Sequence, residues 1–108
     1  MMKQLFEEVR KLQEKELTRA AEQHGSTFNS LHEAYAVMLE EIQEAAQEMR
    51  ETENAAGGLW SFIRHDNEPG AFAAINAIEE RALLLACEAI QVAAMASKAR
   101  TLKKEGTP

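Results

Sequence analysis

The stretch "ALLLACEAIQVAAMA", residues 82–96, decides what fold this chain can adopt. It holds one acid, Glu88, and one amide, Gln91, among residues that are otherwise apolar. As a helix, it would be hydrophobic on nearly every side. Helices of that kind lie at the centre of a fold or between subunits, because one neighbour cannot cover every face.

Two more helices are predicted before this one, and no segment shows the alternating pattern of a strand. Apolar residues at helical spacing place the first helix at about 3–23, the second at about 31–52 and the third at about 71–103. We therefore expect one all-α domain, 1–108, a bundle of three main helices with a frayed tail from about residue 104. Three helices give the apolar third one too little cover, so we expect a homodimer or homotetramer that completes the bundle.

Local signals mark the ends of these helices. Gly25 suits a C-terminal cap, and Ser30 followed three residues later by Glu33 fits a capping box. "NAAGG" is expected to break the second helix, "LWSFIRH" to form a short connecting helix, and "DNEPG" to make a turn. Phe72 is expected in the core. Tyr35 is likewise expected in the core, and it belongs to an apolar stripe of the second helix, which consists of Leu31, Tyr35, Met38, Ile42, Ala45 and Met49.

The net charge of −6 is concentrated in one segment. Residues 25–57 hold seven glutamates against Arg50 alone, while the flanking parts are balanced. Such a segment repels nucleic-acid backbones, so no nucleic-acid partner is expected. Glu88 interrupts the longest apolar run before it reaches the roughly 18 to 20 residues of a membrane helix. With a charged N-terminus and one cysteine, Cys87, this predicts a cytoplasmic protein without a membrane partner.

One face of the second helix gathers carboxylates. Glu40, Glu41 and Glu44 project within an arc of about 100°, and Glu48 extends this face by one turn. Like charges at this spacing repel each other, and a bound divalent cation reverses the sign of that effect. Oxygen ligands alone suit Mg²⁺ or Mn²⁺, and the three histidines lack the spacing that zinc requires. The alternative is an ordinary solvated face, because glutamate is a good helix former.

Glu88, on the apolar third helix, requires either a partner or access to solvent. Burying an ionised carboxylate alone costs on the order of several kcal/mol. A metal ion shared with the second helix would supply positive charge, and Gln91, one turn on, projects within about 60° of Glu88. The alternatives are a salt bridge with Arg64, Arg81 or a neighbouring subunit, and simple exposure at a groove.

The two acidic elements resemble those of a known family. "LEEIQE", residues 39–44, and the later "CEAIQVAAMA", residues 87–96, resemble the all-α nucleoside triphosphate pyrophosphohydrolases, the MazG-like superfamily. The signature of that family is E-E-x-x-E on one helix and E-x-x-D on a later one. "HEAYAVMLEE" with "EAIQVAAMA" is similar to a small bacterial and phage branch. The resemblance covers about residues 31–100.

The resemblance implies Mg²⁺-dependent hydrolysis of an NTP or dNTP to the monophosphate and pyrophosphate, with Mn²⁺ as a substitute. It implies that Glu40, Glu41, Glu44 and Glu88 are metal ligands. Gln91 stands where the family has an aspartate; its amide oxygen can bind a metal but brings no charge and is no general base. A glutamate that the metal does not saturate would take the proton of the attacking water, and Glu41 and Glu44 are the candidates.

Four further residues are candidates for holding the substrate. Lys98 and Arg100 are predicted to meet the outer phosphates; the alternative is that they are ordinary cations at a helix C-terminus, which the helix dipole favours. Arg64 is a third candidate cation. Trp60, with Phe62 beside it, either stacks on the nucleobase or seals the end of the bundle.

Two other functions stay open. Gln91 also fits a nucleotide- and metal-binding protein on the same scaffold that has weakened or lost turnover. A plain helical oligomerisation module, with Glu88 in an intersubunit salt bridge, would explain the apolar helix without any chemistry.

Overall fold

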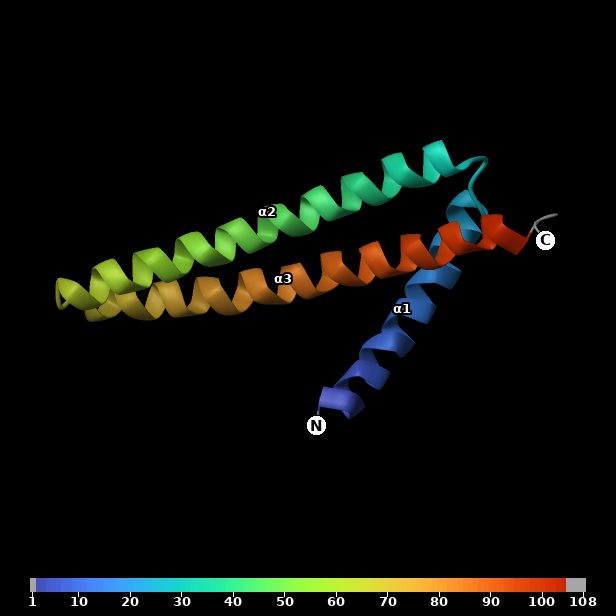
Figure 1. Cartoon of the computed structure of the whole chain (residues 1–108). Helices are drawn as coiled ribbons and strands as arrows, with labels where there is room; N and C mark the ends of the chain where they lie inside the picture. The colour runs from blue at the N-terminus through green and yellow to red at the C-terminus, as the bar shows by residue number, and fades with distance from the viewer. Residues whose placement is uncertain (1, 105–108) are drawn as a thin grey trace. The chain divides into compact units, whose positions relative to one another are not determined.

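The predicted all-α architecture is confirmed. The computed structural model describes residues 2–104, and these form three long helices and no strand (Figure 1). Helix α1 spans Met2–His24, α2 spans Leu31–Arg64 and α3 spans Glu68–Arg100, and a 3-10 turn, η1, follows at Thr101–Lys104. Apart from residue 104 itself, the tail that was predicted to fray lies outside the described residues.

The chain divides into two compact units. The terminal unit comprises the described parts of Met1–Ile42 and Ala89–Pro108, and the hairpin unit comprises Gln43–Glu88. In the hairpin unit, α2 and α3 run side by side in opposite directions and are joined by a short turn (Figure 1). Both units contain parts of α2 and α3. The expectation that the chain is a single domain stays a prediction.

The connection from α1 to α2 has the caps that the sequence predicts. Gly25 adopts φ 88°, and its N–H donates to the carbonyl of Ala21 at 2.9 Å, which ends α1. The hydroxyl of Ser30 accepts from the N–H of Glu33 at 3.1 Å and begins α2. The Glu33 carboxylate accepts from Asn29 N–H at 2.7 Å, one residue before the partner expected in a capping box.

The predicted break at "NAAGG" is wrong, because α2 continues through Gly57 and Gly58 to Arg64. Each glycine costs only about 1 kcal/mol relative to alanine inside a helix. The flanking Ala55 and Leu59 are half-buried, and packing of this kind, with no proline in the segment, offsets that cost. The segment "LWSFIRH" therefore supplies the last turns of α2 and is not a separate helix.

The turn between α2 and α3 is shorter than predicted and occupies residues 65–67. Asp66 adopts φ 54°, a left-handed conformation that aspartate tolerates better than most residues. Asn67 caps α3, since its side-chain oxygen accepts from the N–H of Gly70 at 3.0 Å. Pro69 lies in the first turn, where a missing N–H costs nothing. As a result, α3 begins three residues earlier than expected.

The buried apolar core is small. In the terminal unit it consists of Ala20, Phe28, Ala34, Ala94 and Met95, with Leu17, Val37, Met38, Ala99 and Leu102 packed against it. In the hairpin unit, Ala74 is the buried hydrophobic residue among those described.

Several residues predicted to lie in the core are exposed in the single chain. Tyr35 is 64% exposed and Phe72 is 59% exposed, so the prediction that these two are core residues is wrong. Leu83 of the apolar helix is 64% exposed. A helix packed against one neighbour buries only a strip of its surface, which leaves the rest of an apolar helix uncovered. The expectation that a second subunit covers these side chains stays a prediction.

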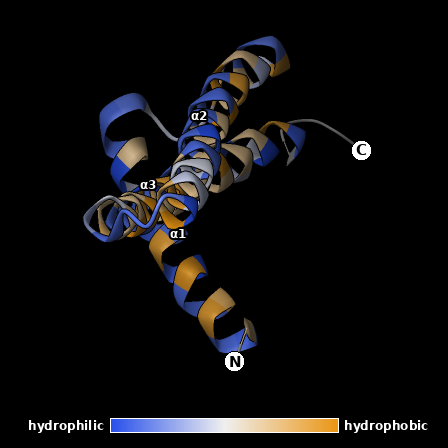
Figure 2. Cartoon of the chain, turned by 90° about the vertical axis from the view of Figure 1, so that its left-hand side faces the viewer, coloured by the Kyte–Doolittle hydropathy of each residue, from blue (hydrophilic) through white to orange (hydrophobic). Residues whose placement is uncertain are grey.

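Helix α1 also carries apolar side chains outward. Figure 2 shows hydrophobic positions along the N-terminal part of this helix. The exposed residues there are Met2, Leu5, Phe6, Val9 and Leu12.

Replacing Gly70 with alanine is expected to destabilise the hairpin unit. A Cβ at this position would lie 2.6 Å from Cδ1 of Phe62, so the aromatic ring would have to move. We expect the free energy of unfolding to fall by about 1–2 kcal/mol, measured by urea denaturation.

The matched control is Gly57→Ala in the interior of α2. Nothing lies within 4 Å of a Cβ at Gly57, so the substitution adds helix propensity without a clash. It should raise the free energy of unfolding by up to about 1 kcal/mol. A gain of equal size in both variants would contradict the packing of Phe62 against Gly70.

Candidate functional site

The predicted carboxylate face forms on α2. One side-chain oxygen from each of Glu40, Glu41 and Glu44 lies within 4.8 Å of the others. Glu41 is half-buried, while Glu40 and Glu44 are exposed. Glu44 follows Glu41 by three positions and Glu40 by four, and residues at these spacings are neighbours on a helix surface, so helix geometry brings Glu44 close to the other two. Carboxylates at this separation can be reached by a single cation, although exposed acidic clusters also occur without one.

In the hairpin unit, Glu88 lies near Glu44 and Glu48 of α2. Desolvation raises the pKa of Glu88 above its ordinary value of 4.5, and a hydrogen bond to Glu44 raises it further. The negative charges of Glu44 and Glu48 act in the same direction. Two carboxyl groups can hydrogen-bond to each other only when a proton is present between them, which is why such a pair resists double ionisation. Glu88 is therefore neither freely solvated nor neutralised by a base.

The salt-bridge alternative for Glu88 is wrong for Arg81. The guanidinium of Arg81 donates to Glu48 Oε1 at 3.2 Å, across from α3 to α2 within the hairpin unit. Arg64 is exposed at the end of α2. Among the described residues, Glu88 makes no ion pair with a basic side chain. Acidic groups therefore dominate its surroundings.

Gln91 lies in the terminal unit and has a partner that the sequence motifs did not indicate. It hydrogen-bonds to Glu16 of α1, whose pKa is lowered first by a hydrogen bond from Arg19 and also by Gln91. Because it stabilises the charged carboxylate, the Gln91 amide is the donor. Its carbonyl oxygen is left to accept a hydrogen bond or bind a metal. Glu16 lies far from both motifs in the sequence, so only the fold identifies it.

The terminal unit contains a cavity of about 460 Å³. Glu41 and Gln91, two of the predicted metal-binding residues, line it together with Lys98 and Phe28. Its size falls in the range of small-molecule sites. In the terminal unit, three of the predicted site residues, Glu41, Gln91 and Lys98, therefore line a cavity that can hold a ligand.

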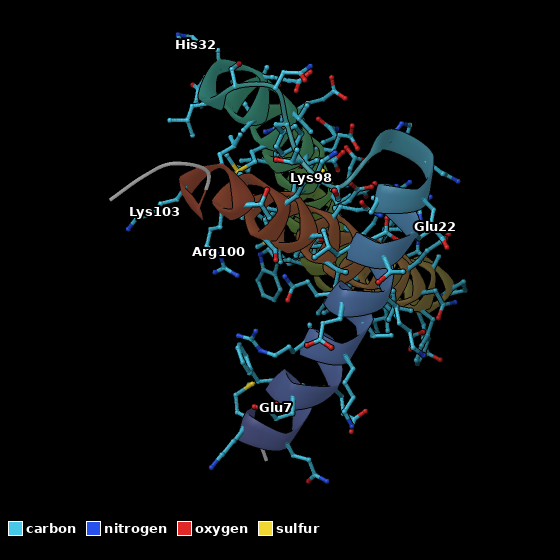
Figure 3. The ribbon with its side chains drawn as sticks, turned by 90° about the vertical axis from the view of Figure 1, so that its right-hand side faces the viewer. Glu7, Glu22, His32, Lys98, Arg100 and Lys103 are labelled. Carbon is cyan, nitrogen blue, oxygen red and sulfur yellow. The ribbon has the colours of Figure 1, made fainter. Side chains whose placement is uncertain are left out.

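Lys98 is not the exposed cation that a helix C-terminus usually carries. Only 5% of the residue is exposed to solvent, and its ammonium lies 4.3 Å from the centroid of the Phe28 ring. Arg100 is exposed and, in Figure 3, points away from Lys98. The phosphate contacts predicted for both residues stay predictions.

Trp60 and Arg64, the other two candidates for substrate binding, belong to the hairpin unit. Trp60 is 60% exposed, so it does not seal an end of the bundle within one chain. Its predicted stacking on a nucleobase stays a prediction.

Comparisons of the chain with protein-family models, with curated proteins and with solved structures find no match. The resemblance to the MazG-like family therefore stays an interpretation of the motifs.

One finding weakens the exclusion of a membrane segment. The helical stretch Glu68–Lys103 is long and apolar enough to span a membrane by length and composition, and 17% of its most apolar 18 residues are buried. The expectation that Glu88 rules out such a segment is therefore too strong. A single helix of this kind is weak support for membrane insertion, and the cytoplasmic location stays a prediction.

The raised pKa of Glu88 predicts a specific pH dependence of stability. The folded state binds more protons than the unfolded state at pH values above 4.5, so stability falls as pH rises through the raised pKa. Glu88→Gln mimics the protonated group. We expect it to raise the melting temperature by about 2–5 °C near pH 7.5 and to have little effect near pH 4.

Glu53→Gln, at an exposed glutamate of α2, is the control for a change of net charge. Thermal unfolding of the three proteins across this pH range is the measurement. An increase in the melting temperature of Glu88→Gln that persists unchanged down to about pH 4 would contradict the account. At that pH Glu88 in the folded parent is protonated and therefore as neutral as the glutamine that replaces it.

Proposed function

We propose that this chain is a Mg²⁺-dependent nucleoside triphosphate pyrophosphohydrolase of the MazG-like kind. The observation that supports the proposal is the arrangement of its acids: Glu40, Glu41 and Glu44 lie within 4.8 Å of one another, and Glu44 hydrogen-bonds to Glu88. Two motifs separated by more than forty residues in the sequence thus share Glu44 as a common member.

The donor set fits a hard divalent cation. It consists of carboxylate oxygens, which are the ligands that Mg²⁺ and Mn²⁺ prefer. The pKa of Glu88 is raised first by desolvation and then by Glu44 and Glu48, whose negative charges remain close to it although Arg81 pairs with Glu48. When bound, the ion would neutralise phosphate charge and acidify the attacking water.

The protein groups then have separable tasks. The carboxylates of Glu40, Glu44 and Glu88 would hold the ion, and Glu88, whose pKa is raised, would release its proton when the ion binds. Glu41 is the better candidate for the general base, because it lines the cavity of the terminal unit and Glu44 does not. A general base must lie within hydrogen-bond reach of the water that it deprotonates. Arg100 and Lys98 are the proposed contacts to the outer phosphates.

A second candidate function is favoured by Gln91. Its amide donates to Glu16 and cannot replace the charge of an aspartate. A protein that binds nucleotide and metal on this scaffold, with weak or no turnover, fits that observation. The exposed apolar side chains of α1 and α3 are compatible with either function in a homo-oligomer.

Pyrophosphate release from a panel of NTPs and dNTPs, with Mg²⁺ or Mn²⁺, tests the enzyme. We expect release from at least one nucleotide, and a fall of about a hundred-fold or more in Glu41→Gln, because the base is lost. Glu22→Gln, an exposed acid of α1 labelled in Figure 3, is the matched control and should keep full activity.

The outcomes separate the candidate functions. Release that is equal in Glu41→Gln and the parent would contradict the assignment of the base. Silence across the panel with clear calorimetric binding of metal and nucleotide would favour the binding protein. Absence of metal binding would leave the helical oligomerisation module.

Gln91→Asp provides a second test. In the absence of metal, the new carboxylate faces Glu16, so we expect the melting temperature to fall. Mg²⁺ should then raise the melting temperature more than it does in the parent, because the added charge strengthens the metal site. In the double variant that also carries Glu16→Gln, the metal-free loss should be smaller. A Mg²⁺ effect no larger than in the parent would contradict a metal-binding role for position 91.

A further inference from the structure

We infer that Glu16 of α1 is a positioning residue of the proposed metal site: it holds the side-chain amide of Gln91 by its nitrogen, so that the carbonyl oxygen is the atom presented to a cation. The inference deepens the proposed function and rests on it, because it concerns the binding of the same metal ion. It gives a task to α1, a helix that carries neither of the two acidic motifs.

The packing of α1 on α3 in the terminal unit places Glu16 beside Gln91. Gln13, three residues before Glu16, donates from its side-chain nitrogen to the carbonyl oxygen of Ala93 on α3 at 3.1 Å. Only 15% of the Glu16 side chain is exposed, and Gln91 is half-buried. A carboxylate with so little access to water requires hydrogen-bond donors from the protein. Gln91 is one of these donors.

Glu16 is itself fixed in place by Arg19. The Nε atom of Arg19 lies 2.9 and 3.1 Å from the two carboxylate oxygens of Glu16, and its other nitrogens bond to Glu16 and to Gln23. The bond from Arg19, and after it the bond from Gln91, keep the pKa of Glu16 below its ordinary value. The carboxylate is therefore charged at neutral pH and can only accept hydrogen bonds, so it selects the nitrogen of the Gln91 amide.

The orientation of this amide decides whether position 91 can bind a metal. The nitrogen and oxygen of a glutamine amide exchange places when its last torsion turns by about 180°, and only the oxygen can be a ligand. Of the described residues, Gln91 lines the cavity of the terminal unit together with Glu41, whereas Glu16 does not line it. With the nitrogen bound to Glu16, the oxygen is the amide atom left for a cation. An aspartate would need no such partner, because both of its oxygens are ligands.

The first test is calorimetric titration of the full chain with Mg²⁺. Glu16→Gln and the control Glu22→Gln each remove one negative charge from α1, and Glu22 is an exposed residue labelled in Figure 3. We expect Glu16→Gln to weaken Mg²⁺ binding about ten-fold and Glu22→Gln to keep the parent affinity. In a Gln91→Ala background, Glu16→Gln should have no further effect, because Glu16 acts through Gln91.

A second test uses NMR without metal and begins with the unaltered chain, because a replacement of Glu16 can also disturb folding. The side-chain amide protons of Gln91 should show nuclear Overhauser effects to the side chain of Glu16. In Glu16→Gln, the same amide signals should move towards those of a solvated glutamine. A purely structural role of Glu16 would lower the melting temperature and leave the affinity for Mg²⁺ unchanged.

Three results would each overturn the inference. They are absence of the contact in the unaltered chain, equal Mg²⁺ affinity in the parent and a folded Glu16→Gln protein, and an equal loss of affinity in the Gln91→Ala background. The proposed function survives all three, provided that the parent binds Mg²⁺. A parent that binds no Mg²⁺ would overturn the proposed function and the inference together.

Discussion

The proximity of Glu88 to Glu44 in the hairpin unit is the constraint on which the proposed chemistry of this chain depends. Glu88 is the one acid in a stretch of fifteen otherwise almost wholly apolar residues, and in the hairpin unit it meets the acidic face of α2. Arg81, the nearest base available to such a group in the sequence of α3, pairs with Glu48. In the proposed function, a bound cation would offset the cost in stability of concentrating carboxyl groups at neutral pH.

The terminal unit has a different electrostatic character. Its cavity is lined by Lys98, which lies on an aromatic ring, by Arg19, which pairs with Glu16, and by Gln91. Polar groups of both signs beside apolar walls allow the recognition of a ligand by charge and shape together. Glu41, the proposed general base, is one of the residues that line this cavity.

The sequence predicts the helices better than their surroundings. Helical spacing, Gly25 and Ser30 suffice for the class of fold and for the end of α1 and the start of α2, because these signals are local. The break at Gly57 and Gly58 is wrong because packing overrides a modest propensity. The bond between Glu16 and Gln91 joins residues far apart in the sequence, which no motif encodes. The burial of Lys98 likewise depends on where the loop carrying Phe28 folds.

Paramagnetic NMR with Mn²⁺ tests the central claim, that the acidic face of α2 and Glu88 hold a divalent cation, most directly. We expect substoichiometric Mn²⁺ to broaden the amide signals around residues 40–48 and around residue 88 before all others, and excess Mg²⁺ to restore them. Broadening spread evenly over the exposed acids of α1 and α2, or no broadening at all, would contradict the claim. Either of those results would show that the face is an ordinary solvated one.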